Sequence, residues 1–269
     1  MDFLFYVFAG AGVGLAVGVT GVGGGSLMTP LLILFGIPLH IAIGTDLLYA
    51  SLTKASGVYA HAKQGSIRWR LVLLLAAGSI PGALITTYFL DSIFANASAY
   101  ESVLTSSLGG MLVATSLVLF FKSKIQSPTQ APSVLAQWFQ KRAQAVTVIA
   151  GLLLGVFVTL SSVGAGAFCA VLLLLLYPRL PALQVIGTDI AHAVPLTLIA
   201  GLGHLTLSNP DAGTWVVGNV DFQLLGCLLL GSLPAVHIGT KLGARLPSRV
   251  LQSILASVLM VLGAKFLLF

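Results

Sequence analysis

Long apolar stretches separated by short polar segments divide this chain into eight parts. A helix that crosses the hydrocarbon of a bilayer needs about 20 apolar residues, and six of the stretches have roughly that length. They predict six single transmembrane helices, at 39–61, 67–90, 100–121, 181–206, 218–240 and 249–269. The other two stretches, at 3–36 and 143–177, are too long for one crossing.

Each long stretch is interrupted near its middle by glycine and small polar residues. The first contains Thr20-Gly21-Val22-Gly23-Gly24-Gly25, and the second contains Ser161-Ser162-Val163-Gly164-Ala165-Gly166. Glycine permits backbone conformations that end a helix, so each stretch predicts two shorter helices that meet at a break. Such a hairpin begins and ends on the same side of the membrane, whether it crosses fully or only re-enters.

The interrupted stretches belong to a duplication. Ile43-Gly44-Thr45-Asp46 returns 143 positions later as Ile186-Gly187-Thr188-Asp189, and Gly78-Ser79-Ile80-Pro81 returns as Gly231-Ser232-Leu233-Pro234. The two glycine-rich breaks and these two repeated motifs occur in the same order in both parts of the chain, which indicates two related halves. We therefore expect a first transmembrane repeat at 1–121, a cytoplasmic linker at 122–142 and a second transmembrane repeat at 143–269.

Composition places the chain in a bilayer. Hydrophobic residues make up 57% of the chain, charged residues make up 7%, and the mean hydropathy is +1.04, so the apolar surface could not be covered in water. The net charge of +6 does not predict a nucleic-acid partner, because the basic residues lie in short loops between apolar spans. Cys169 and Cys227 lack CxxC spacing, so we expect reduced packing residues rather than a redox pair or a metal site.

Lysine and arginine predict the orientation, since short loops rich in these residues stay cytoplasmic. Alternating crossings place 11 of the 13 basic residues on one side: Lys63, Arg68, Arg70, Lys122, Lys124, Lys141, Arg142, Arg179, Lys241, Arg245 and Arg249. The acidic residues outside the apolar spans then fall on the other side, together with both chain termini. This predicts a multi-pass membrane protein whose termini face outward.

The number of membrane crossings in each half also predicts the fold. Each half contributes one hairpin and three crossings, which is an odd number, so the second half is inverted relative to the first. The expected fold class is an all-α integral membrane protein with two inverted repeats, each a glycine-broken helical hairpin plus three transmembrane helices. Many secondary transporters are built this way, with the substrate site near the midplane between the repeats.

The hairpin tips are the first candidate site. A half-helix that starts at such a tip directs free N–H groups and the positive end of its dipole toward the protein centre, which suits an anion. Ser26 or Thr29 is expected to cap the returning helix of the first hairpin. The candidate substrate-binding residues are Thr20, Gly21, Gly23, Gly24, Gly25, Ser26, Ser161, Ser162, Gly164, Ala165 and Gly166. The alternative is that the glycines only permit close helix packing.

Asp46 and Asp189 form the second candidate, because a carboxylate two turns into an apolar span is costly and usually faces the bundle interior. Such a group commonly serves as a proton or cation site; the alternative is an interhelical hydrogen bond without a transport role. His192 shares a helix face with Asp189, and Tyr49 holds the equivalent place near Asp46. Thr45 and Thr188 would either line the path or bond to their own helices.

Lys54 lies well inside a first-half span and has no basic counterpart in the second half, where Thr197 takes its place. It would either supply positive charge to an anionic substrate or extend toward the cytoplasmic end of its helix. His40, His61, His204 and His237 lie near span ends and are expected to be interfacial.

The residues of the first tip, Gly21-Val22-Gly23-Gly24-Gly25-Ser26, together with Ile43-Gly44-Thr45-Asp46, its repeat and Gly78-Ser79-Ile80-Pro81-Gly82, resemble the TauE/SafE sulfite exporter family of inner-membrane permeases. The resemblance covers essentially the whole chain. It implies secondary export of a small sulfur-containing anion, either sulfite or an organosulfonate. The second hairpin departs from the first, with Ala165 and Ala167 where Gly24 and Ser26 stand.

The functional expectation is therefore an anion exporter that works by alternating access, with Asp46 or Asp189 as the group that couples export to protons. Its expected partners are a small sulfur oxyanion and membrane lipids, without a cofactor or metal. An alternative is a cation or metal transporter that uses the two intramembrane Asp residues. An enzyme is not expected, because the chain has no HExxH, CxxC or GxSG-like motif.

Overall fold

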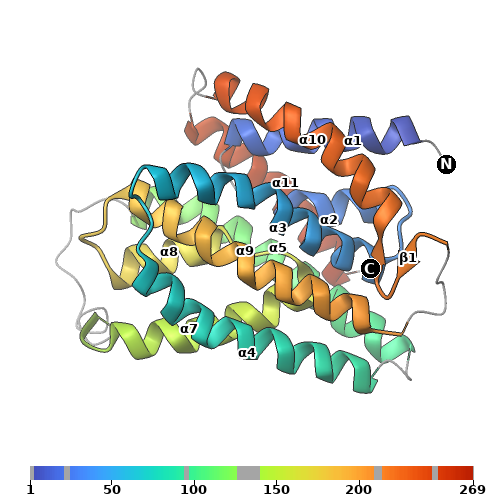
Figure 1. Ribbon diagram of the computed structural model, residues 1–269, viewed down its shortest axis with the longest axis horizontal. Helices are drawn as coiled ribbons and strands as arrows, with labels where there is room; N and C mark the ends of the chain where they lie inside the picture. Colours follow the sequence, from blue (N-terminus) through green and yellow to red (C-terminus); the bar gives the residue numbers. More distant parts are fainter. Residues whose placement is uncertain are drawn as a thin grey trace.

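A computed structural model describes residues 3–20, 25–93, 97–125, 140–208, 214–243 and 248–268. The described residues are almost entirely helical, as predicted, with one short two-stranded hairpin (Figure 1). The elements are α1 (Phe3–Thr20), α2 (Gly25–Leu34), α3 (Leu39–Lys63), α4 (Trp69–Ile93), α5 (Ala97–Ile125), α7 (Ala143–Ser161), α8 (Ala167–Leu176), α9 (Ala182–Thr206), β1 (Val216–Val217), β2 (Val220–Asp221), α10 (Phe222–Gly243) and α11 (Ser248–Leu268).

Five of the described helices are long and apolar enough to cross a membrane: Trp69–Ser92, Ala99–Phe121, Ala143–Ser161, Ala182–Thr206 and Phe222–Gly239. α3 has 25 residues and is long enough, but it is less apolar because it contains Asp46, Lys54 and several hydroxyl side chains. These lengths and compositions support the predicted multi-pass membrane protein.

The second predicted hairpin is divided into a long arm and a short arm. α7 has 19 residues and α8 has 10, which correspond to about 28 Å and 15 Å at 1.5 Å per residue. α8 therefore has the length to cross about half of a 30 Å hydrocarbon layer. α1 and α2 have 18 and 10 residues, so the first hairpin has the same proportions, although its break at 21–24 lies outside the described residues.

The two halves of the sequence are intertwined rather than packed as separate bodies. α1 of the first half packs along α10 of the second, and α7 of the second half packs along α4 of the first. Glycines permit both contacts, since a Cβ added at Gly14 would lie 2.6 Å from the carbonyl oxygen of Ser232. A Cβ added at Gly155 would collide in the same way with the carbonyl of Ser79. The matching Ser79 and Ser232 thus pack against matching helices.

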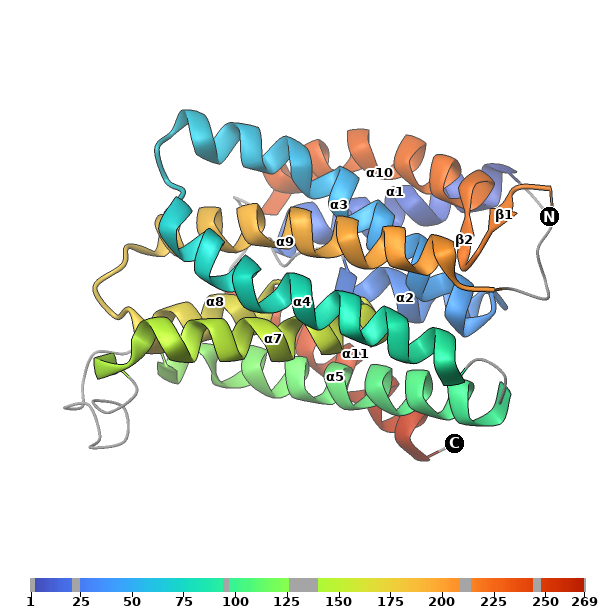
Figure 2. The same cartoon turned by 60° about the horizontal axis from the view of Figure 1, so that its bottom comes forward.

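α3 and α9 lie side by side at the centre of the molecule and run in opposite directions (Figures 1 and 2). Ile43 and Leu47 of α3 share an apolar core cluster with Ala193, Leu196 and Ala200 of α9. An inverted pair of halves requires this opposite course of matching helices. The inversion across a bilayer stays a prediction.

The helix junctions separate into two ends of the molecule. The α3–α4 junction, the start of α7, the α8–α9 junction and the end of α10 lie at the left in Figure 1, and these segments carry Lys63, Arg142, Arg179 and Lys241. The α2–α3 junction and the β1–β2 hairpin lie at the opposite end, toward which α1 begins and α11 ends. The basic junctions thus gather at one end.

Candidate functional site

The second hairpin tip breaks the helix inside the protein. Ser162 follows α7 with a φ of 56°, and Gly164 has a φ of 108°, so both backbones are left-handed. The Ser161 hydroxyl donates to the Phe157 carbonyl at 2.7 Å and accepts from the backbone N–H of Val163 at 3.2 Å. Ser161, Ser162 and Ala165 are all buried. Non-helical backbone is therefore present where a membrane protein can tolerate it, namely surrounded by protein.

Residues of the short arm α8 follow directly after this tip. Gly166 precedes α8 with no described side chain capping the helix, so its first N–H groups do not receive the usual side-chain acceptor. A Cβ added at Gly164 would collide with the Cε atom of Met111, and it would lie 3.4 Å from the Phe168 ring. The tip is therefore packed closely against α5.

Asp46 lies where both hairpins meet α3. The Thr29 hydroxyl of α2 donates to Asp46 Oδ2 at 2.5 Å, and the Ser162 hydroxyl at the second tip lies close to the same carboxylate. Asp46 is completely buried, and none of the described residues forms a well-aligned hydrogen bond with its Oδ1 or with Ser162 Oγ. Thr29 lies in the second turn of α2, which begins at Gly25, so Thr29 does not cap that helix.

Asp189 lies in a corresponding cluster on α9. The Cys169 thiol of α8 interacts with Asp189, and Cys169 Sγ lies 3.9 Å from His192 Nδ1. The other ring nitrogen of His192 shares a hydrogen bond of 2.8 Å with the Ser79 hydroxyl. Cys169 and Cys227 are free and buried as predicted, but the sequence reading missed that Cys169 contacts candidate site residues. The signal available was its place in the first turn after the tip.

Lys54 lies within electrostatic range of both carboxylates, Asp46 and Asp189, and of Cys169. Its side chain is half-buried rather than extended freely from the helix end. A positive charge therefore lies within range of carboxylates from both halves, and contact of Lys54 with a substrate stays a prediction. Unlike charges in such surroundings attract more strongly than they do in water.

Several of the remaining candidates form matched contacts between the halves. Thr45 accepts a hydrogen bond of 3.0 Å from the backbone N–H of Asp221, and Thr188 accepts one of 3.0 Å from that of Arg68. Tyr49 interacts with Ser232, as His192 does with Ser79. Thr45 and Thr188 therefore each bond the backbone N–H of the residue just before a helix of the opposite half. Neither sequence expectation had included such a contact.

The first hairpin tip is only partly described. Gly21, Gly23 and Gly24 lie outside the described residues. Thr20 ends α1, while Gly25 and Ser26 begin α2, and their side chains are likewise outside the described set. The candidate site that can be built is therefore Thr29, Asp46 and Ser162 with the neighbouring Lys54, Cys169, Asp189 and His192.

No group of three or more His, Cys, Asp or Glu side chains within the described ranges is arranged to hold a metal ion. The clustered donors are instead hydroxyl groups, one thiol, one imidazole and one ammonium group. Hydroxyl and ammonium groups donate hydrogen bonds to oxyanions, so this donor set can bind a small anion.

A buried polar network, here named the His204 clasp, closes the end of α9 and consists of Tyr100, Thr159, His204 and Asn219. His204 Nε2 donates to the Thr159 carbonyl at 2.9 Å, and Asn219 Nδ2 donates to the Tyr100 hydroxyl at 2.7 Å. The backbone N–H of Asn219 also donates to the His204 carbonyl at 2.9 Å. His204 and Asn219 are completely buried, so the expectation of an interfacial histidine did not anticipate this network.

The matching position of α3 carries a smaller network, the His61 clasp, formed by His61 and Ser66. His61 Nδ1 and the Ser66 hydroxyl are 2.8 Å apart, and the backbone N–H of Ser66 donates to the His61 carbonyl at 3.0 Å. His61 is 143 positions before His204 and is half-buried. The sequence signal for both clasps was this spacing, which equals that of Asp46 and Asp189.

A multi-pass helical bundle with buried charged groups beside a broken helix has the construction of a membrane transporter. The family described as Sulfite exporter TauE/SafE matches residues 6–266, so the chain belongs to the TauE/SafE family. It is 38% identical to the probable membrane transporter protein YjnA of Bacillus subtilis over 97% of this chain and 98% of that protein.

More distant relatives have similar names. The chain is 27% identical to the probable membrane transporter protein YdhB of Bacillus subtilis, over 90% of each chain. It is 29% identical to a probable membrane transporter protein of Xylella fastidiosa (strain 9a5c), over 82% of each chain. No solved structure matches the chain at a significant level. Membership of a transporter family is thus established, and the substrate is a separate question.

Proposed function

We propose that this protein exports a small sulfur-containing anion, sulfite or an organosulfonate, through a site between α2, α3 and the second hairpin tip. The observation that carries the proposal is the completely buried Asp46, approached by Thr29 of one hairpin and Ser162 of the other. Buried polar atoms that lack a full set of protein partners are costly to maintain, and a bound ligand or proton offsets that cost.

The donor chemistry supports an oxyanion. Ser162 and the N–H groups at the start of α8 provide neutral donors, and Lys54 provides positive charge. Charge-assisted hydrogen bonds to sulfite or sulfonate oxygens are stronger than neutral ones, so a single ammonium group among hydroxyls favours an anion over an uncharged solute. Asp46 and Asp189 would oppose the anion unless one of them is protonated.

That opposition supports proton coupling. Asp46 and Asp189 both lie within electrostatic range of Lys54, so an incoming anion would compete with them for its charge. Protonation of Asp46 or Asp189 would release Lys54 to the anion, and loss of the proton would displace the anion. Movement of an anion out of a negative interior also gains about 2.3 kcal/mol per charge per 100 mV.

Alternating access is supported by the unequal clasps. The His204 clasp is completely buried, whereas His61 is half-buried, so the polar centre is better covered toward one end. With the basic junctions in the cytoplasm, the covered end faces outward and both termini lie outside. The proposed state is therefore closed to the outside, and the proposed location is the cell inner membrane of the family's permeases.

The test is efflux from proteoliposomes loaded with sulfite or a simple sulfonate, with and without a pH gradient. Wild-type protein should release the anion faster than empty liposomes, and Asp46→Asn should abolish the response to pH. Ser162→Ala and Thr29→Val should lower the rate about tenfold, since each removes a donor at the buried centre. Thr197→Val is the matched control, because the buried Thr197 hydroxyl bonds only the Ala193 and Val194 carbonyls of its own helix among the described residues.

Efflux of neither anion under any gradient would overturn the anion proposal. Transport of a cation that depends on both Asp46 and Asp189 and is unaffected by Ser162→Ala would establish the cation alternative instead. Anion efflux that is indifferent to pH in both wild type and Asp46→Asn would retain the substrate class and remove proton coupling.

A further inference from the structure

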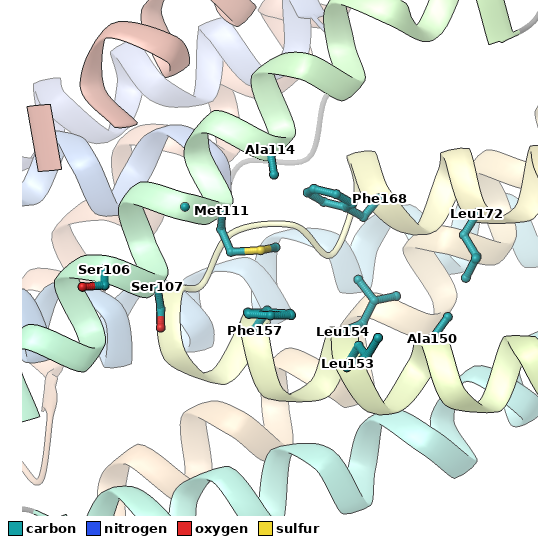
Figure 3. A pocket seen from close by; sticks show the side chains of 11 residues that line it. Ser106, Ser107, Met111, Ala114, Ala150, Leu153, Leu154, Phe157, Phe168 and Leu172 are labelled. Atoms are coloured by element: carbon teal, nitrogen blue, oxygen red, sulfur yellow. The ribbon is translucent and has the colours of Figure 1, made fainter. Parts of the chain in front are cut away.

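An apolar cavity of about 510 Å³ lies beside the second hairpin, between α5, α7 and α8. Figure 3 shows Met111 of α5, Phe157 of α7 and Phe168 of α8 around this space. Among the residues that line it, Ser106 and Ser107 are the polar ones. The cavity is separate from the charged centre around Asp46, so the proposed anion site does not explain it.

The first half has a second cavity of about 440 Å³ in the matching place, between α1, α2 and α11. Val13 and Leu27 line it where Leu154 and Phe168, 141 positions later, line the other. The pairs Ala16 with Phe157 and Leu31 with Leu172 have the same spacing. Two cavities at equivalent positions of both halves are a property of the architecture and not an accident of local packing.

Both cavities have walls on the outer, membrane-facing side of the bundle. Leu153 is 52% exposed and Phe157 41% exposed at the first cavity, while Leu34 is 52% exposed at the second. Water is not stabilised in such an apolar space, because a buried water molecule needs two to four hydrogen-bond partners. An empty space would lose the dispersion contacts of its lining. In a bilayer, lipid acyl chains can fill such a space, because they need no hydrogen-bond partners.

We propose that the acyl chain of a membrane phospholipid occupies each cavity and, at the first cavity, supports the adjacent hairpin tip. Met111 and Phe168 line the first cavity and are also the side chains packed around Gly164 at the tip. A chain lodged against them restricts their rotamers, and thereby restricts the backbone that carries Ser162. The short arms α2 and α8 are thus held in place partly by lipid.

Gly110 offers a way to fill the first cavity without a collision. It lines the cavity, and a Cβ added there has no neighbouring atom within 4 Å. Gly12 has the same properties at the second cavity. Gly226 of α10 is equally open but lines neither cavity, so Gly226→Leu is the matched control for Gly110→Leu and Gly12→Leu.

The experiment is native mass spectrometry of protein purified in mild detergent, combined with melting curves in the presence of added phosphatidylglycerol. Wild type and Gly226→Leu should retain phospholipid and be stabilised by several degrees. Gly110→Leu and Gly12→Leu should each retain fewer phospholipids, and the double variant should lose most of the stabilisation. Equal retention and equal stabilisation in all five proteins would overturn the proposal.

A second copy of the chain is the other occupant to distinguish. If Gly110→Leu converts a dimer into a monomer without changing phospholipid retention, the cavity is a subunit contact and the lipid proposal is wrong. If Gly110→Leu fails to fold, Ala114→Leu fills the same cavity from the next turn of α5. None of these readouts requires transport, so they are independent of the proposed substrate.

Discussion

The second halves of α3 and α9 occupy equivalent positions in the duplication but are covered to different extents. Thr197, Ala200 and His204 of α9 are almost completely buried. Their counterparts 143 positions earlier, Lys54, Gly57 and His61 of α3, are half-buried. The duplication thus repeats the course of the helix but not how deeply the helix is buried, and the two ends of the molecule differ in this respect.

The end of α9 is more deeply buried than the end of α3 because of segments that follow α9 in the chain or pack against it. The β1–β2 hairpin brings Asn219 onto His204, and the Tyr100 hydroxyl of α5 accepts a hydrogen bond from Asn219 Nδ2. At the other end, the α3–α4 junction supplies Ser66 alone to His61 among the described residues. The contacts of Asn219 and Tyr100 therefore distinguish the buried end of α9 from the half-buried end of α3, and each can be tested separately.

The largest expected effect is on chemical accessibility. Gly57→Cys should react with a water-soluble maleimide faster than Ala200→Cys by about tenfold or more, because labelling of a buried site requires a local opening. Wild type provides the blank, since Cys169 and Cys227 are buried. Equal labelling rates at the two matched positions would show that both ends are equally covered and would remove the basis of the comparison.

Asn219→Ala should weaken the His204 clasp by about 1–3 kcal/mol, since it leaves buried groups of Tyr100 and His204 without their partner. Ser66→Ala should cost less, about 1 kcal/mol, because His61 is partly exposed and water replaces the lost hydroxyl. Thermal unfolding in detergent gives the ranking. A larger shift for Ser66→Ala than for Asn219→Ala would contradict it.

Tyr100→Phe should have a smaller effect than Asn219→Ala, about 0.5–1.5 kcal/mol, because Asn219 keeps its contact with His204. It should also raise the labelling rate of Ala200→Cys. Tyr88→Phe is the control, since Tyr88 is 79% exposed and lies outside the clasp. Identical melting curves for Tyr100→Phe and wild type would mean that this hydrogen bond does not hold the end closed.

The smallest difference is expected where the halves are most alike. Thr45→Val and Thr188→Val each remove an acceptor for one backbone N–H of the opposite half, and both threonines are completely buried. Their unfolding free energies should therefore agree within about 0.5 kcal/mol. A disagreement of several kcal/mol would show that the asymmetry extends from the ends to the centre of the molecule.

Periodicity and spacing were sufficient to predict the helical elements and the position of the break in the second hairpin. The stretch at 143–177 is two helices that meet at Ser162–Gly166, and the predicted spans correspond to helices of similar bounds. Burial of the two intramembrane carboxylates also followed from sequence, because a charge deep in an apolar span must face protein. These features depend on local residues and on the thickness of the bilayer.

The contacts between distant segments could not be read in this way. Cys169 looked like an ordinary packing residue, yet α8 places it beside Asp189 and His192, and Thr29 bonds Asp46 instead of capping α2. The packing of α1 on α10 and of α7 on α4 likewise depends on both partners being present.

The sequence by itself determined that this is a membrane protein of two related halves with broken hairpins and buried acids, since hydropathy and glycine positions act locally. Only the tertiary structure decided which hydroxyls reach Asp46, which charged groups surround Lys54 and which of the two histidines is fully buried. The physical reason is that these contacts join segments far apart in the sequence: Tyr100 and Asn219 meet at His204 because of how the chain packs, and hydropathy around His204 does not reveal these partners.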